Sequence, residues 1–104
     1  MFCTFYQNNS GGYFIQNEDV DGYVIIEGDT LDEILDSAEE IFESYREYCE
    51  CCGERWNDYL VDEDDLTDVP SIYGRSVYEY HYGFNCDLKA IIYYKNGKRE
   101  NILI

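Results

Sequence analysis

The fold is decided by residues 23–45, which read YVIIEGDTLDEILDSAEEIFESY. Residues 23–27 form a short, nearly all-apolar run, which predicts a central strand. Thr30 is the expected N-cap of a helix, and Glu33, three residues further on, completes a capping box. Apolar side chains then recur at helical spacing and predict one buried stripe. The members of that stripe are Leu31, Ile34, Leu35, Ala38, Ile41, Phe42 and Tyr45.

Strand and turn signals precede and follow this stretch. Residues 2–6 and 13–16 flank the turn-forming run 8–12, and together they predict an N-terminal hairpin. Residues 49–70 predict an irregular loop that is rich in cysteine and acidic residues. The apolar residues 59–61 are expected to anchor this loop to the core.

The C-terminal part of the chain carries further strand signals. Residues 76–82 alternate and predict a strand, while residues 88–94 and 98–104 flank an Asn-Gly pair, a strong hairpin signal. We expect one α+β domain over residues 1–104. Its largely antiparallel sheet would have about five or six strands in the order β-β-β-α-loop-β-β-β, with one amphipathic acidic helix packed on it.

The charge of the chain is large and uneven. There are 23 acidic and 7 basic residues, a net charge of −16. Residues 1–70 hold 20 Asp and Glu against two arginines, a net of −18, whereas residues 71–104 hold five basic and three acidic residues, a net of +2. A folded chain with this asymmetry presents a negative face to a cationic partner. The same charge repels anionic lipid and nucleic acid phosphates, so direct binding to a membrane or a nucleic acid is not expected.

Targeting signals are missing from the sequence. No apolar run reaches the length of about 18 residues that a bilayer span needs. The N-terminus has no basic region of the kind that begins a signal peptide. These features predict a cytoplasmic protein.

The predicted helix turns an almost uniformly acidic face to solvent. Successive turns rise about 5.4 Å, so its carboxylates form a row on the scale of neighbouring phosphates in a nucleic acid strand. Surface helices gain stability from opposite charges four residues apart, whereas neighbours of the same sign destabilise the free protein. Both a charged binding face and plain solubility are compatible with this pattern. The candidate partner-binding carboxylates are Asp32, Asp36, Glu39, Glu40, Glu43 and Glu47 in the helix and Asp62, Glu63, Asp64, Asp65 and Asp68 in the loop. The candidate aromatic anchors near them are Tyr45, Tyr48, Trp56 and Tyr59.

Three of the five cysteines lie together in the run Cys49-Glu50-Cys51-Cys52-Gly53. The C-x-x-C-Gly pattern resembles half of a zinc ribbon, which needs two further ligands. Partly buried free thiols are a second interpretation, and a redox role or a disulfide is a third. Acidic neighbours are expected to raise the thiol pKa values, which disfavours thiol catalysis. The candidate zinc ligands are Cys49, Cys52, Cys86 and His81, with Cys3 and Cys51 as alternatives.

The sequence contains no specific catalytic motif. Residues 17–22 begin like a calcium loop, but Gly28 stands where the bidentate Glu belongs, so a turn is expected there. His81 has no Ser or Asp partner placed by a motif, which favours a half-buried structural histidine. A phosphate-binding glycine loop and an H-E-x-x-H motif are both missing. We therefore expect no enzymatic activity.

Three stretches carry a resemblance to known proteins. Residues 6–13, residues 23–27 running into the acidic helix, and residues 51–56 together resemble small acidic proteins encoded in tailed-phage genomes. The resemblance implies an inhibitor of host defence that acts as a DNA decoy on a restriction enzyme or a CRISPR effector.

Three hypotheses for function result. The first is a binding protein without catalysis that blocks a basic, nucleic-acid-binding surface of a host protein. The second is a small zinc-stapled structural or adaptor module for protein–protein assembly, and a homodimer is compatible with either. The third is capture of a small ligand by the tyrosine-rich sheet. An anionic ligand is disfavoured unless the basic residues converge on one pocket, namely Arg75, Lys89, Lys95, Lys98 and Arg99.

Overall fold

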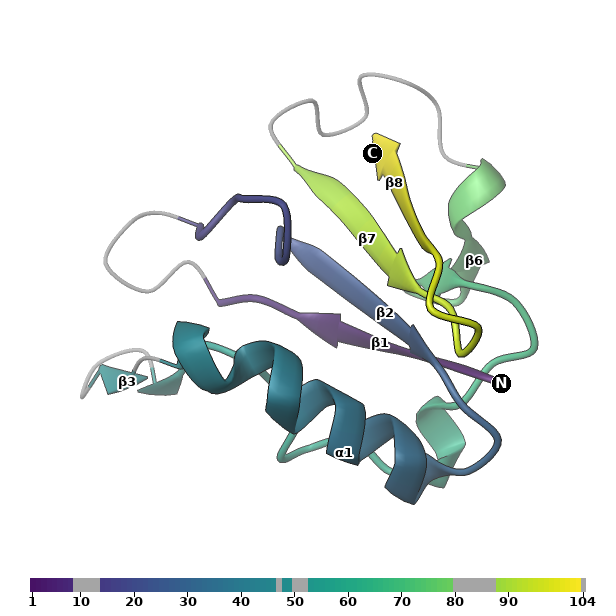
Figure 1. Ribbon diagram of the computed structural model, residues 1–104, viewed down its shortest axis with the longest axis horizontal. Coiled ribbons are helices and arrows are strands. Elements are labelled where there is room, and N and C mark those ends of the chain that lie inside the picture. Colours follow the sequence, from purple (N-terminus) through teal and green to yellow (C-terminus); the bar gives the residue numbers. More distant parts are fainter. Residues whose placement is uncertain (9–13, 47, 50–52, 80–87, 104) are drawn as a thin grey trace.

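The computed structural model describes residues 1–8, 14–46, 48–49, 53–79 and 88–103 (Figure 1). The helical elements are α1 (Leu31–Phe42) and the short 3₁₀ turns η2 (Glu43–Tyr45), η3 (Glu63–Asp65) and η4 (Val77–Glu79). The strands are β1 (Phe2–Tyr6), β2 (Tyr23–Glu27), β3 (Tyr48–Cys49), β4 (Gly53–Glu54), β5 (Ser71–Ile72), β6 (Arg75–Ser76), β7 (Lys89–Tyr93) and β8 (Arg99–Leu103). This confirms the predicted α+β class with one α-helix in the described part of the chain.

The main sheet has the strand order β1-β2-β7-β8. The β1–β2 and β7–β8 pairs are antiparallel, whereas β2 and β7 are parallel. The small pairs β3–β4 and β5–β6 form separate two-stranded sheets. The sheet is therefore mostly antiparallel, as predicted, but the main sheet has four strands, fewer than expected. The central strands β2 and β7 are buried on both faces, which explains their continuous apolar sequences.

The predicted N-terminal hairpin is wrong. The partner of β1 is β2, with Cys3 opposite Ile26, and residues 14–16 form no strand. The backbone of Ile15 is instead bound by the side chain of Gln7: the Ile15 N–H donates to Gln7 Oε1 (2.6 Å) and Gln7 Nε2 donates to the Ile15 carbonyl (3.0 Å). A side-chain amide thus takes the place of a strand ladder.

The predicted strand at 76–82 is also not formed in its described part. Only Ser76 belongs to a strand, β6, and the chain then enters the turn η4. Residues 80–82 lie outside the described residues. The predicted hairpin that follows is confirmed as β7–β8. The Gly97 N–H donates to the Tyr94 carbonyl (3.0 Å), and Gly97 has φ 91, a conformation that favours glycine.

The helix α1 begins at the predicted cap. Thr30 is extended (φ −134), and its hydroxyl accepts a hydrogen bond from the Glu33 N–H (3.2 Å). The Glu33 carboxylate accepts in turn from the Asp29 N–H (2.9 Å), so the expected capping box is closed one residue earlier. Ile34, Ala38 and Phe42 are fully buried, which confirms the predicted apolar stripe at its centre.

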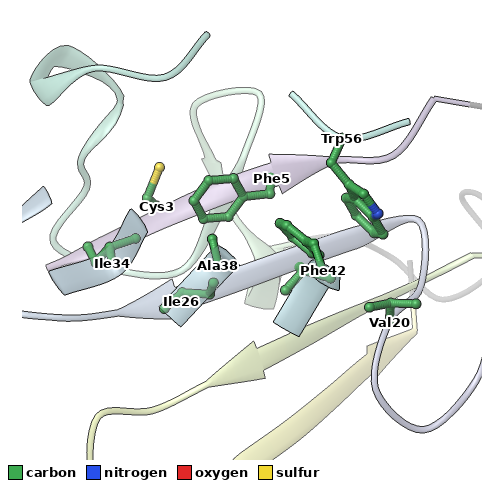
Figure 2. Packing of buried hydrophobic residues seen from close by; sticks show 9 residues of the cluster. Cys3, Phe5, Val20, Ile26, Ile34, Ala38, Phe42 and Trp56 are labelled. Atoms are coloured by element: carbon green, nitrogen blue, oxygen red, sulfur yellow. The ribbon is translucent and has the colours of Figure 1, made fainter. Parts of the chain in front are cut away.

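The core lies between α1 and one face of the sheet (Figure 2). Ile34 and Ala38 face Cys3 and Phe5 of β1, with Ile26 of β2 beside them. The members of this cluster are Cys3, Phe5, Val20, Val24, Ile26, Ile34, Ala38, Phe42 and Trp56. The helix thus covers the β1–β2 half of the sheet (Figure 1).

A second, smaller cluster covers the opposite face of the sheet. Ile25, Ala90 and Ile92 of the central strands pack against Ile72 of β5 and Val77 of η4. The 71–79 segment therefore serves as the second layer, with α1 as the first. This face also carries the half-buried Tyr6 and Tyr23 and the exposed Tyr73, described below.

The outer edge of β1 is covered by the 53–72 segment. Phe2 and Thr67 exchange backbone hydrogen bonds of 2.7 and 2.8 Å, and the Tyr6 N–H donates to Asn57 Oδ1 (2.8 Å). Because an unpaired strand edge invites pairing with another chain, this cover protects the sheet. The long loop predicted for 49–70 is thus tied to β1, and it contains β3, β4 and η3.

Candidate functional site

The outward face of α1 is acidic along its whole length. Asp32, Asp36, Glu39, Glu40 and Glu43 are all exposed, and the last turn of the helix contains no basic residue. Four of these side chains and that of Arg46 line a shallow surface hollow of about 370 Å³. The structure therefore places five of the six predicted helix carboxylates on one surface. Glu47, the sixth, lies outside the described residues.

Three of the described basic side chains pair with carboxylates outside α1. The Arg46 guanidinium forms a bidentate ion pair with the Asp58 carboxylate, with N–O distances of 2.8 and 2.6 Å. Lys95 pairs with Asp29 (2.7 Å), and the hydrogen bond and charge of Lys95 hold the pKa of Asp29 below its usual value. Arg99 pairs with Asp19 at 3.0 Å.

These ion pairs have two consequences. Among the ion pairs between described residues, none involves a carboxylate of α1. Within the described part of the chain, no ion pair therefore neutralises the acidic face. Lys95 and Arg99 pair with different aspartates, so these two basic residues do not converge on one pocket. An anionic ligand would need such a convergence.

The predicted acidic loop contains a capped 3₁₀ turn, η3. Asp62 caps η3: its Oδ1 accepts from the Asp64 N–H (2.9 Å), and Asp65 Oδ2 accepts from the Asp62 N–H (2.9 Å). All three side chains are exposed, as are those of Glu63 and Asp68.

The two acidic segments lie at the same end of the molecule. In Figure 1 η3 lies beside the first turn of α1. Leu66 and Val61, which flank η3, pack on the same core cluster as α1. After burial, the negative charge of Asp65 is the second cause that raises the pKa of Cys3, a member of that cluster. In the view of Figure 1, the predicted loop carboxylates of η3 therefore lie toward the same end of the molecule as the first turn of α1.

The predicted aromatic anchors differ in how far their side chains are buried. Trp56 is a core residue, 1% exposed, and its ring stacks on Phe42 with centroids 4.1 Å apart (Figure 2). It is buried because residues 55–56 run beside the end of β1, and this corrects its assignment to the surface. Tyr45 is half-buried, and its hydroxyl donates to Asp19 (2.8 Å). Tyr59 is 64% exposed, as an aromatic anchor for a partner would be. The side chain of Tyr48 is not among those that the structure describes.

The candidate zinc ligands fall almost entirely outside the described residues. This holds for Cys52, Cys86, His81 and Cys51, and only the backbone of Cys49 is described, in β3. Cys3 is fully buried, and burial raises the pKa of its thiol to about 12. Among the described side chains, no three of His, Cys, Asp or Glu are grouped to hold a metal ion. The zinc prediction therefore stays a prediction.

A cluster of three tyrosines was not predicted. Tyr6, Tyr23 and Tyr73 meet on the face of the sheet opposite α1, with Tyr6 and Tyr73 stacked at 5.0 Å between ring centroids. A hollow of about 350 Å³ adjoins them. The sequence signal that could have indicated this cluster is Tyr73-Gly74, a turn dipeptide with an aromatic residue where Asn is usual.

The fold and its surface define a small α+β protein whose single described α-helix presents an acidic face. The chain belongs to a family described as Domain of unknown function (DUF7296), whose model matches residues 1–103. No curated protein and no solved structure matches the chain. These comparisons do not bear on the resemblance to tailed-phage proteins. In the described part of the chain, no helix has the length and apolar character of a membrane span.

Proposed function

We propose that this protein binds and blocks a basic, nucleic-acid-binding surface of another protein and has no catalysis of its own. The observation that supports this most directly is the row Asp32, Asp36, Glu39, Glu40 and Glu43 on the outer face of α1. The row is exposed, of one sign, and unpaired in the ion pairs between described residues. A cationic groove built for phosphates is the complementary surface.

The spacing of the row suits such a groove. A helix rises about 1.5 Å per residue, so the distance along the axis from Asp32 to Glu43 is about 16 Å. Five carboxylates over that length give about one charge per 3–4 Å, compared with one phosphate per about 3.4 Å along each DNA strand. The η3 carboxylates extend the negative surface beyond the first turn of α1.

The energetics of the free helix favour a binding role over plain solubility. Asp32, Asp36 and Glu40 are successive neighbours four residues apart, as are Glu39 and Glu43, and each like-charged pair destabilises the helix. Glu43 also lies at the C-terminal end, where the helix dipole favours cations. Solubility alone needs no arrangement that costs stability, since mixed charges serve it as well.

The first experiment is a pull-down from a host lysate with this chain as bait, at low and at high salt. We expect retention of a basic nucleic-acid-binding protein at low salt and its release by salt or by competing DNA. Retention of no basic protein, or of a partner indifferent to salt, would contradict the proposal.

The second experiment uses variants of equal charge. The pair Asp36→Lys with Glu43→Lys alters the row, whereas Glu18→Lys with Glu79→Lys makes the same change in net charge at exposed positions outside it. We expect the first pair to weaken binding of the captured partner by at least about tenfold, and the control pair by much less. If both pairs weaken binding equally, net charge alone is responsible and the helix face is not the binding surface.

A zinc-stapled adaptor module is the second candidate. The observation in its favour is that β3 pairs with β4 so that Cys49 lies opposite Gly53, which has φ 80. A glycine in this conformation beside a C-x-x-C pair is typical of a zinc turn. Zinc bound in a 1:1 ratio, with a large fall in melting temperature on chelation, would support this candidate, and a metal-free protein of unchanged stability would remove it.

A further inference from the structure

The tyrosine cluster forms one wall of a hollow on the face of the sheet away from α1. Tyr6 of β1 and Tyr23 of β2 are cross-strand neighbours, and their rings meet edge to face at 5.7 Å. Tyr73, from the β5–β6 turn, stacks on Tyr6 at 5.0 Å and meets Tyr23 edge to face at 6.4 Å. Among the described residues, Gln7, Phe14, Gln16, Gly22 and Leu88 also line the hollow, which has a volume of about 350 Å³. Its volume and mixed aromatic and amide lining are typical of a small-molecule site.

The backbone at Tyr73 is unusual for an aromatic residue. Tyr73 has φ 53 and Gly74 has φ 77, so both central residues of the turn between Ile72 and Arg75 are left-handed. Asn-Gly is the preferred pair for such a turn, and a bulky side chain at positive φ is strained. Tyr73 as a whole residue is nevertheless 76% exposed. Strain that holds an exposed aromatic ring at the rim of a hollow points to a role in binding.

A buried carboxylate lies directly behind the hollow. Asp21 is fully buried, and its Oδ1 accepts from the Gly22 N–H (2.7 Å), the Lys89 N–H (2.9 Å) and Gln16 Nε2 (3.2 Å). Two of these donors, Gly22 and Gln16, belong to residues that line the hollow. The second oxygen, Oδ2, has no hydrogen-bond partner among the described residues. An unsatisfied buried carboxylate oxygen is rare in folded proteins and favours a nearby positive charge.

Further carboxylates lie on the other side of the stacked pair. Tyr6 and Tyr73 also line a neighbouring hollow of about 280 Å³ together with Asp64 and Asp65. Among the described residues that line this second hollow, the charged side chains are those of the two aspartates. Tyrosine faces themselves carry a negative quadrupole, which attracts cations.

We propose that the tyrosine hollow binds a small organic cation, of the class of quaternary or other alkylated ammonium compounds. Its cationic head would contact the faces of the tyrosine rings, with Asp21 behind the wall contributing to the field. The net charge of −16 disfavours an anion. A neutral ligand of the same shape would gain nothing from the ring quadrupoles or the carboxylates. This site is separate from the acidic row of α1, because α1 covers the opposite face of the sheet. Asp64 and Asp65, which line the neighbouring hollow, also belong to the acidic loop of the proposed partner surface.

Choline and its neutral carbon isostere, 3,3-dimethylbutan-1-ol, test the proposal directly. Their dissociation constants are measured by NMR titration of the intact chain at low salt. We expect choline to bind at least about fivefold more tightly than the isostere, the scale of a cation–π contact. Equal or tighter binding of the isostere, or no binding of either compound, would overturn the proposal.

Two variants place the binding in the hollow. Tyr73→Asn suits the turn and removes the ring, and Tyr73→Gly does the same should the first variant fail to fold. Either variant should weaken choline binding at least about fivefold. The matched control, Tyr59→Asn, removes an exposed tyrosine elsewhere at unchanged net charge and should leave choline binding unchanged. Unchanged choline binding after loss of the Tyr73 ring would overturn the assignment to this hollow.

Discussion

Trp56 is the side chain that closes the core at the C-terminal end of α1. Its ring stacks on Phe42, and its indole N–H donates to the Tyr45 carbonyl (3.3 Å). We expect Trp56→Ala to lower the free energy of unfolding by about 3–5 kcal/mol, because it leaves a large cavity and an unpaired carbonyl. Urea denaturation followed by far-UV circular dichroism measures this. Tyr59→Ala, at an exposed position, is the control and should change stability by less than about 0.5 kcal/mol.

Cys3 provides a chemical test of the same core. Its thiol is fully buried, and burial raises its pKa to about 12, so the thiol stays protonated at neutral pH. The thiolate is the reactive form, so iodoacetamide should leave Cys3 unmodified in the native protein at pH 8 and modify it in urea. Peptide mapping by mass spectrometry distinguishes Cys3 from the other four cysteines. Rapid alkylation of Cys3 in the native state would show that β1 opens readily.

At the residue scale, side chains governed by a regular pattern were predictable and those in irregular segments were not. Asp36 and Glu40 are exposed as expected because helical periodicity assigns them to the face opposite Ile34. Trp56 was assigned to the surface because its acidic surroundings show no periodicity. The buried contact of Trp56 depends on a segment that returns to β1, which no local signal encodes. The strain at Tyr73 depends likewise on backbone angles that only the folded hairpin defines.

Repulsion between like charges destabilises α1, and a single substitution can remove part of it. Asp36 has acidic neighbours four residues away on both sides, Asp32 and Glu40. Asp36→Lys replaces two repulsions by two attractions and should raise the free energy of unfolding by about 0.5–1 kcal/mol at low salt. Thermal melts at low salt and at 0.5 M NaCl measure the effect, which salt should reduce.

The neutral variant Asp36→Asn separates the effect of removing a repulsion from the effect of adding an attraction. Asp36→Asn removes the repulsion without adding an attraction, so its free energy of unfolding should lie between that of the wild type and that of Asp36→Lys. A loss of stability for Asp36→Lys would mean that the helix row is already neutralised in the free protein. The same substitution weakens the proposed partner surface, so stability and binding should change in opposite directions.

Elements were predictable where their determinants lie close together in the chain. The cap at Thr30 and the stripe from Ile34 to Phe42 fall within one short segment, and the helix forms as expected. The parallel pairing of β2 with β7 joins Val24 to Ile91 across most of the chain. Strand-forming runs indicate that two segments extend, but partner and direction follow from the whole packing arrangement.

At the scale of the whole molecule, Asp19 joins elements that are far apart in the chain. Its carboxylate accepts from the Tyr45 hydroxyl at the end of η2 and from Arg99 of β8. Its backbone carbonyl accepts from the Tyr93 hydroxyl of β7, and the Arg99 guanidinium lies over the Tyr93 ring at 4.6 Å. This cluster links the end of the helical layer to the β7–β8 half of the sheet, which α1 does not cover.

The linkage gives stability a defined dependence on pH. The hydrogen bond from Tyr45 and, next, the one from Arg99 hold the pKa of Asp19 below its usual value of 3.8. A carboxyl whose pKa is lower in the folded state stabilises the fold above its unfolded pKa, and this contribution is lost as pH falls through the folded value. Asp19→Asn should therefore be less stable than the wild type at pH 7, with the difference shrinking below pH 4 and vanishing once Asp19 is protonated in both states. Thermal melts of both proteins from pH 7 to pH 2 measure this, and Asp68→Asn, an exposed carboxylate outside the cluster, should show no such convergence. A constant difference between wild type and Asp19→Asn across this range would show that the cluster acts through packing, and that the charge of Asp19 does not hold the two layers together.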